Sequence, residues 1–127
     1  MPSRQYHRGQ HPEDAKLFAP KWRPTLRTAT RHFSWLLSQG YAEKAALKLV
    51  GDHFQLHARQ RNALQRAACS DAALAGRRQH RVGPEALSGA VLAIDGYNLL
   101  ITIESALAGG VLLRGRDRCV RDLASMH

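Results

Sequence analysis

The sequence predicts an α+β fold that is mostly helical, in which a basic helical module is followed by a single βα unit. From Thr25 to about His80, apolar residues recur at the three- and four-residue steps that line one face of a helix. After Gly83 and Pro84 the pattern changes to a short, continuous apolar run of the kind found in strands buried on both faces. The 127 residues suffice for one domain with a modest core.

Residues 1–24 are predicted to form a flexible basic arm. Proline interrupts both helices and sheets, and this segment contains four of them: Pro2, Pro12, Pro20 and Pro24. We expect the aromatic side chains of Phe18 and Trp22 to fix the end of the arm to the rest of the protein.

Residues 25–83 are predicted to form the helical module. Its first helix ends at Gly40, a residue suited to the left-handed turn that follows a helix, and its predicted inward residues are Leu26, Ala29, Phe33, Leu36 and Leu37. A second helix is expected over about 42–50, with inward residues Ala45, Ala46, Leu49 and Val50. A third is expected over about 58–73 and could continue to His80.

Residues 84–127 are predicted to contain the βα unit. The apolar run at 90–94 predicts a buried strand, residues 95–98 a tight turn, and residues 99–107 a mostly buried helix. A second short strand is expected at 111–113. A final helix is expected at 117–124, with Asp117 as its N-cap.

The charge is distributed unevenly along the chain. The formal net charge is +9, made up of +5 in residues 1–40, +5 in residues 41–83 and −1 in residues 84–127. A strongly basic surface attracts polyanions through counterion release, so we expect a nucleic acid as partner, RNA rather than DNA. No apolar run approaches the roughly 18 residues of a membrane span. The first residues lack the apolar stretch of a secretory signal, so we expect no membrane partner and a cytoplasmic location.

The basic residues of the helical module are the candidates for nucleic-acid contact. Helices at about 42–50 and 58–73 approximate a helix-turn-helix, in which Arg59 and Arg61 would reach base edges. The connection is longer than usual for that motif. The alternative interpretation is therefore a solvated outer face of a bundle helix. The complete predicted set is Arg59, Arg61, Arg66, Arg77 and Arg78.

Asp95 and Asn98 are the candidates for catalysis. They follow the predicted strand, and the carboxyl ends of parallel strands are where ligands bind in α/β sheets. A carboxylate there suits Mg²⁺ or Mn²⁺, which can activate water and stabilise a phosphoryl transition state. The alternative is an ordinary Asp-Gly turn in which Asn98 caps the helix.

Residues 91–100 (VLAIDGYNLL) resemble the opening strand and turn of PIN-like and NYN-type ribonucleases. The resemblance implies that Asp95 is a metal ligand supported by Asn98. Those families need further carboxylates, and the later acids are Glu104, Asp117 and Asp122, of which we take Asp122 as a second ligand. Only 32 residues follow Asp95, which is about the first third of such a domain. We therefore expect little or no activity from this chain.

A second resemblance covers residues 27–127. The blocks 34–41 (SWLLSQGY), 45–54 (AALKLVGDHF), 59–64 (RQRNAL), 92–102 (LAIDGYNLLIT) and 109–117 (GGVLLRGRD) look like the prokaryotic family called domain of unknown function 434. Members of that family generally continue past the position of His127, so this chain is similar to a truncated member. The family has no assigned activity, and the resemblance implies fold more than function.

The sequence thus predicts a metal-dependent, PIN-like nuclease module that acts on RNA. Two alternatives stay open. One is a non-catalytic helical domain that binds nucleic acid. The other is an interaction domain that forms a homodimer when the lone strand pairs with a second copy, since an isolated strand leaves backbone groups unsatisfied.

Overall fold

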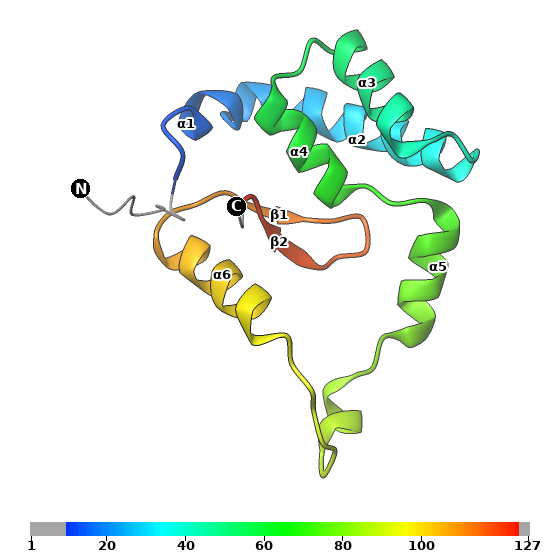
Figure 1. The fold of residues 1–127 in the computed structure, drawn as a ribbon, viewed down its shortest axis with the longest axis vertical. Coiled ribbons are helices and arrows are strands. Elements are labelled where there is room, and N and C mark those ends of the chain that lie inside the picture. The colour runs from blue at the N-terminus through cyan, green and yellow to red at the C-terminus, as the bar shows by residue number, and fades with distance from the viewer. Residues whose placement is uncertain (1–9, 125–127) are drawn as a thin grey trace, which may run out of the picture.

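The computed structural model describes residues 10–124, so the first nine residues of the predicted arm lie outside it. This part of the chain forms helices and one antiparallel pair of short strands (Figure 1), which confirms a mostly helical α+β fold. In chain order the elements are α1 (Asp14–Leu17), η1 (Pro20–Trp22), α2 (Arg23–Ser38), α3 (Glu43–His53), α4 (Ala58–Ala67), α5 (Asp71–His80), η2 (Pro84–Leu87), α6 (Gly96–Leu107), β1 (Leu112–Arg114) and β2 (Val120–Asp122).

The hydrophobic core lies between α2, α3 and α4. Ala29 and Phe33 of α2 are completely buried, as their spacing predicts. In α3 the predicted inward face is partly wrong, because Ala45 and Leu49 are exposed. Ala46 and Val50 are buried in the core as predicted, and Leu47, which was not predicted, also packs against it.

The segment from Asp14 onward is not an arm. Two of its prolines stand in the first turns of η1 and α2, where the missing N–H of proline is not needed. Leu17 is buried against the helical module, and the side-chain amide of Gln60 donates a hydrogen bond of 2.8 Å to its carbonyl oxygen. The side chain of Asp14 is also fully buried, in an ion pair with Arg59.

The predicted third helix is divided into α4 and α5. Ala68 adopts an extended conformation and ends α4. The hydroxyl of Ser70 then accepts a hydrogen bond of 3.1 Å from the backbone N–H of Ala73, which makes Ser70 the N-cap of α5. A serine followed by Asp71 in the first turn is a start signal for a new helix. Here this signal outweighs the apolar periodicity that continues across the break.

The C-terminal part forms a β-hairpin in place of the predicted last helix. β1 and β2 are antiparallel, with Leu113 opposite Arg121. The predicted strand at 111–113 is thereby confirmed to within one residue, and the helix at 117–124 is wrong. Asp117 lies in the hairpin loop, where it accepts a hydrogen bond from the N–H of Cys119, and Arg118 has a positive φ of 66° that no helix allows.

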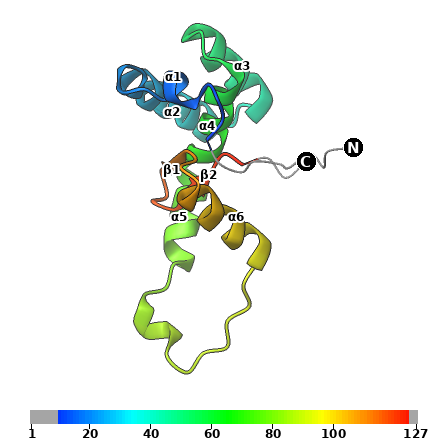
Figure 2. The same ribbon diagram turned by 90° about the vertical axis from the view of Figure 1, so that its left-hand side faces the viewer.

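The predicted strand at 90–94 is not a strand in the structure. Residues 90–95 are irregular and exposed, with Val91 completely exposed and Ile94 64% exposed. This segment belongs to the open loop that joins α5 to α6 below the hairpin (Figures 1 and 2). Among residues 10–124 no second strand lies beside it, and a strand cannot be buried without neighbours.

The predicted helix that follows is present as α6, but it is mostly exposed rather than mostly buried, because only Ile101 and Ser105 of its residues are buried. It begins three residues earlier than expected, at Gly96, because Asp95 acts as its N-cap. Its buried residues Ile101 and Ser105 lie on the side that faces the hairpin. No helix among the described residues is long and apolar enough to cross a bilayer.

Candidate nucleic-acid interface

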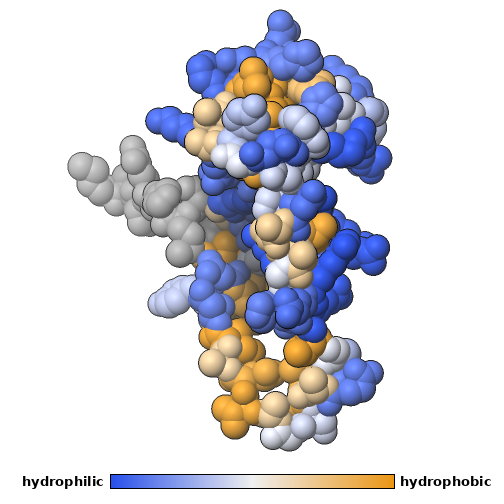
Figure 3. Space-filling model, turned by 90° about the vertical axis from the view of Figure 1, so that its right-hand side faces the viewer, coloured by the Kyte–Doolittle hydropathy of each residue, from blue (hydrophilic) through white to orange (hydrophobic). Residues whose placement is uncertain are grey.

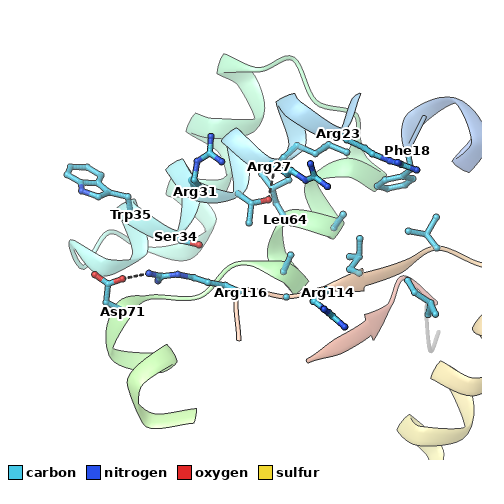
Figure 4. A pocket seen from close by; sticks show the side chains of 18 residues that line it. Phe18, Arg23, Arg27, Arg31, Ser34, Trp35, Leu64, Asp71, Arg114 and Arg116 are labelled. Atoms are coloured by element: carbon cyan, nitrogen blue, oxygen red, sulfur yellow. Dashed lines mark hydrogen bonds and ion pairs between the residues drawn. The ribbon is translucent and has the colours of Figure 1, made fainter. Parts of the chain in front are cut away.

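A basic groove of about 950 Å³ lies between α2 and β1 (Figure 4). Its floor contains apolar residues of α4, including Leu64, and its two sides are α2 and the strand side of the hairpin. The lining contains five arginines and a single carboxylate: Arg23, Arg27, Arg31, Arg114, Arg116 and Asp71. The groove therefore has a strong excess of positive charge at neutral pH.

The α2 side of the groove carries a row of side chains spaced four residues apart. Arg23, Arg27, Arg31 and Trp35 occupy successive turns, and residues at this spacing are neighbours on a helix surface. Arg23 and Arg27 form no ion pair with any residue between 10 and 124, and Arg31 donates only to the hydroxyl of Thr28. Trp35 at the end of the row is 61% exposed. These cations and this ring are free to contact a ligand.

The opposite side of the groove comes from β1 and the hairpin loop. Arg114 forms no ion pair within the described part of the chain. Arg116 donates to the carbonyl oxygen of Cys69 at 2.8 Å and to the carboxylate of Asp71 at 2.5 Å. The second contact neutralises Asp71, so the only acid of the groove does not repel an incoming phosphate.

Ser34 adds a buried polar group to the lining. The residue is only 5% exposed, and its hydroxyl oxygen makes no hydrogen bond in the structure. Figure 4 shows Ser34 on the groove side of α2. A buried hydroxyl without a partner is uncommon, because leaving it unsatisfied costs about 1–3 kcal/mol. A ligand oxygen in the groove would satisfy it.

Most of the arginines predicted to bind nucleic acid are instead engaged in ion pairs within the chain. Their carboxylate partners are Asp14 for Arg59, Asp52 for Arg61, Asp122 for Arg66 and Asp117 for Arg77. Arg78 is exposed, and among the described residues its side chain has no hydrogen-bond partner. The structure does not bring these five arginines to the groove.

Asp117 is the centre of the strongest of these ion-pair clusters. Its buried carboxylate accepts hydrogen bonds from Arg121 at 2.6 and 2.8 Å and from Arg77 at 3.1 Å. The hydrogen bonds from Arg121 hold the pKa of Asp117 far below its ordinary value, and they raise the pKa of Arg121. The cluster fixes α5 to the hairpin, so it is structural.

Asp95 and Asn98 lie close together at the start of α6, where Asp95 is the N-cap, and both the metal-site and the helix-cap interpretations of this segment allow that arrangement. The side-chain amide of Asn98 donates to one carboxylate oxygen of Asp95 at 2.5 Å, and its backbone N–H approaches the other at 3.4 Å. Asp122 is not close to this pair. It accepts a hydrogen bond of 2.7 Å from Thr102, and the helix rise places Thr102 about 10 Å further along α6 than Asp95. No group of three or more histidine, cysteine or acidic residues that could hold a metal ion occurs among the described residues.

Sequence reasoning missed the arginine row of α2. A signal was present, because arginine at 23, 27 and 31 followed by tryptophan at 35 is a four-residue repeat within a helical segment. Only the structure shows that β1 faces this row. That contact depends on a hairpin about 80 residues away, whose second strand was predicted as a helix.

Two family profiles match the chain. Residues 25–80 are similar to the family described as "Protein of unknown function (DUF434)". Residues 84–127 are similar to a second family, described as "Domain of unknown function (DUF5616)". The first match agrees with the resemblance of the blocks at 34–41, 45–54 and 59–64, whereas the blocks at 92–102 and 109–117 lie within the second match.

A relative in Methanocaldococcus jannaschii, described as an uncharacterized protein, is 25% identical over 103 residues. The match covers 81% of this chain and 50% of the relative, so the chain spans about half the length of that relative. No solved structure matches the chain.

Proposed function

We propose that this protein binds single-stranded RNA in the cytoplasm, through the groove between α2 and β1. The observation on which the proposal rests is the row formed by Arg23, Arg27 and Arg31, whose guanidinium groups have no carboxylate partner within residues 10–124. Single-stranded nucleic acids are bound by positively charged grooves that follow the backbone and by aromatic rings on which bases stack. Here the arginines would contact phosphates, and Trp35 would stack on a base.

The size and shape of the groove favour a single strand over a duplex. A volume of about 950 Å³ between a helix and a hairpin suits a few nucleotides, whereas a duplex needs a broad surface or an inserted helix. The helix that the sequence offers for insertion is α4. Its N-terminal arginines Arg59 and Arg61 are held by Asp14 and Asp52, so they are not available to base edges.

Metal-dependent cleavage of the bound RNA is the second candidate. Asp95 is exposed and its carboxylate is oriented by Asn98, so it could be one ligand of Mg²⁺ or Mn²⁺. A phosphoryl-transfer site needs more carboxylates than this, and the described residues do not supply them near Asp95. We therefore propose binding without cleavage for this chain.

The test is the affinity of a fluorescein-labelled oligouridylate, measured by fluorescence anisotropy over a series of salt concentrations. We expect the double variant Arg23→Ala, Arg27→Ala to bind roughly tenfold more weakly or worse, and its log–log salt slope to fall by about 1.4, which is about 0.7 for each lost phosphate contact to a single strand. The matched control is Arg78→Ala, Arg81→Ala, which removes two exposed arginines without ion pairs at the end of α5. It should bind almost as the wild type does.

Three results would count against the proposal. If the control pair loses affinity and the groove pair does not, the site is on α5. If neither double variant binds RNA more weakly than the wild type, the arginines of the groove do not contribute to RNA binding. If the wild-type chain cleaves RNA in the presence of Mg²⁺ and the Asp95→Asn variant does not, the protein is a nuclease and the second candidate is correct.

A further inference from the structure

An exposed apolar surface covers α6 and the loop segment before it. We call it the apolar face. It consists of large side chains that are 45% to 100% exposed: Val91, Leu92, Ile94, Tyr97, Leu99, Leu100, Ile103 and Leu107. Figure 3 shows apolar side chains concentrated at the lower end of the molecule, whereas the upper helical part is largely hydrophilic. Exposed apolar patches of this extent indicate an interaction site.

Helix α6 is apolar on two sides. Ile101 and Ser105 are buried toward the hairpin, while Leu100 is 63% exposed and Leu107 is 85% exposed on other sides of the same helix. A helix that is hydrophobic all round is typical of a buried position. Among the described residues the hairpin covers one side of α6, and the exposed leucines on its other sides are open to a partner.

The segment before α6 has backbone groups that are not hydrogen-bonded to the described part of the chain. Within the described residues, the backbone N–H and C=O groups of 91–94 form no hydrogen bonds to the protein. An exposed apolar segment with unpaired backbone groups is a template for pairing with another strand. The face therefore offers both apolar side chains and free backbone groups.

The lack of charge on this face favours a second copy of the chain as the partner. From residue 86 to residue 103 the only formally charged side chain is Asp95, whereas residues 1–83 carry a net charge of +10. A nucleic acid or an acidic protein would find no cations on this face. Two copies of the chain can meet here without bringing the arginine rows together, because α2 lies at the opposite end of the molecule from the loop that contains residues 91–94 (Figure 1).

We infer that the apolar face is the interface of a two-fold symmetric dimer of this chain. In such a dimer residues 91–94 of the two copies pair as antiparallel strands, which satisfies their backbone groups. The exposed side of α6 is covered by the same residues of the other copy. Both basic grooves stay accessible, so the inference does not depend on the proposed function.

The first test is sedimentation equilibrium on the full chain and on two matched leucine variants. The wild type should have twice the chain mass of 14.1 kDa at micromolar concentration. Leu100→Glu on the apolar face should weaken the dimer by roughly a hundredfold, since each substitution acts twice in a two-fold interface. The control is Leu49→Glu, which changes an equally exposed leucine on α3 and should remain dimeric.

The circular dichroism spectrum and the urea unfolding midpoint decide whether the Leu100→Glu variant is folded. A wild-type chain that stays monomeric at every concentration overturns the inference, because the face must then be covered by some other polypeptide. Equal effects of Leu100→Glu and Leu49→Glu overturn it as well.

The second test is disulfide crosslinking, which reports on strand pairing directly. In a symmetric antiparallel pair, one residue lies opposite its own copy with a Cα separation of about 4.5–5.5 Å. Single cysteines at positions 91, 92, 93 and 94, each in a Cys119→Ser background, should therefore include one that forms a covalent dimer rapidly. The control is Ala75→Cys on exposed α5. The inference is wrong if none of the four crosslinks faster than this control.

Discussion

Replacing Arg59 by alanine should destabilise the protein and leave the basic groove between α2 and β1 intact. Arg59 is the side chain that the helix-turn-helix interpretation places on a base, whereas the structure places it on Asp14. Its guanidinium group donates two hydrogen bonds, of 2.6 and 3.0 Å, to a carboxylate that has no exposed surface. Without Arg59 this buried charge keeps one hydrogen bond, from the backbone N–H of His11 at 2.9 Å.

The magnitude follows from the burial of the two partners. Removing one partner of a buried ion pair costs about 3–5 kcal/mol, because the other charge is left without compensation. The side chain of Arg59 is 23% exposed, so water can enter and partly solvate Asp14 after the truncation. We therefore expect the free energy of unfolding to fall by about 2–3 kcal/mol.

The assay is urea unfolding followed by circular dichroism, in a double-mutant cycle of Arg59→Ala and Asp14→Ala. The double variant should be less destabilised than the sum of the single variants, since it removes both charges together. Arg27→Ala is the control, and its free energy of unfolding should stay within about 0.5 kcal/mol of the wild type. If Arg59→Ala unfolds at the wild-type urea concentration but loses RNA affinity, the ion-pair interpretation is refuted.

Three further predictions concern other parts of the structure. Because Arg121 holds the pKa of Asp117 below its ordinary value of 3.8, the stability from this cluster should be present above about pH 4 and be lost as the pH falls further. Asp117→Asn should flatten that acid slope in urea titrations, and an unchanged slope would contradict the assignment. Gln60→Ala should cost about 1–3 kcal/mol in thermal unfolding, because the completely buried amide links Leu17 to the start of α4, and a neutral result would show that this link is dispensable. Trp35→Ala should weaken RNA binding by about 1–3 kcal/mol in anisotropy titrations without lowering the melting temperature, and unaltered affinity would exclude stacking there.

Local patterns in the sequence predicted the helical half of the fold well. The repeat of Ala29 and Phe33 placed α2 correctly, because one face of an amphipathic helix is determined by residues within a few turns of each other. The break at Ser70 was also a local signal, but the apolar periodicity of the surrounding alanines obscured it. Errors in this half are errors of boundary and of facing direction.

The C-terminal half could not be predicted in the same way, because its structure depends on distant contacts. Residues 90–94 have the composition of a buried strand, but a strand is formed only when another strand lies beside it. Asp117 was expected to cap a helix, and it instead holds the hairpin to α5 through Arg77, a residue forty positions earlier. Neither pairing leaves a short-range pattern.

The candidate site shows the same division. The close approach of Asp95 and Asn98 follows from a three-residue spacing at the start of a helix, so the sequence was enough to predict it. The sequence singled out basic residues of the helical half, and four of those five arginines are held in ion pairs in the folded chain. Which cations are free depends on where the carboxylates lie in space, and Asp14 and Asp122 reach Arg59 and Arg66 only in the folded chain.

The location of bound RNA can be measured directly by following the backbone amide resonances of a ¹⁵N-labelled chain as oligouridylate is added. We expect the largest shifts in α2 from Arg23 to Trp35 and across the groove from Val111 to Arg116. Shifts confined to the start of α4, or to residues 95–98, would contradict the claim that the unpaired arginines of α2 form the binding surface.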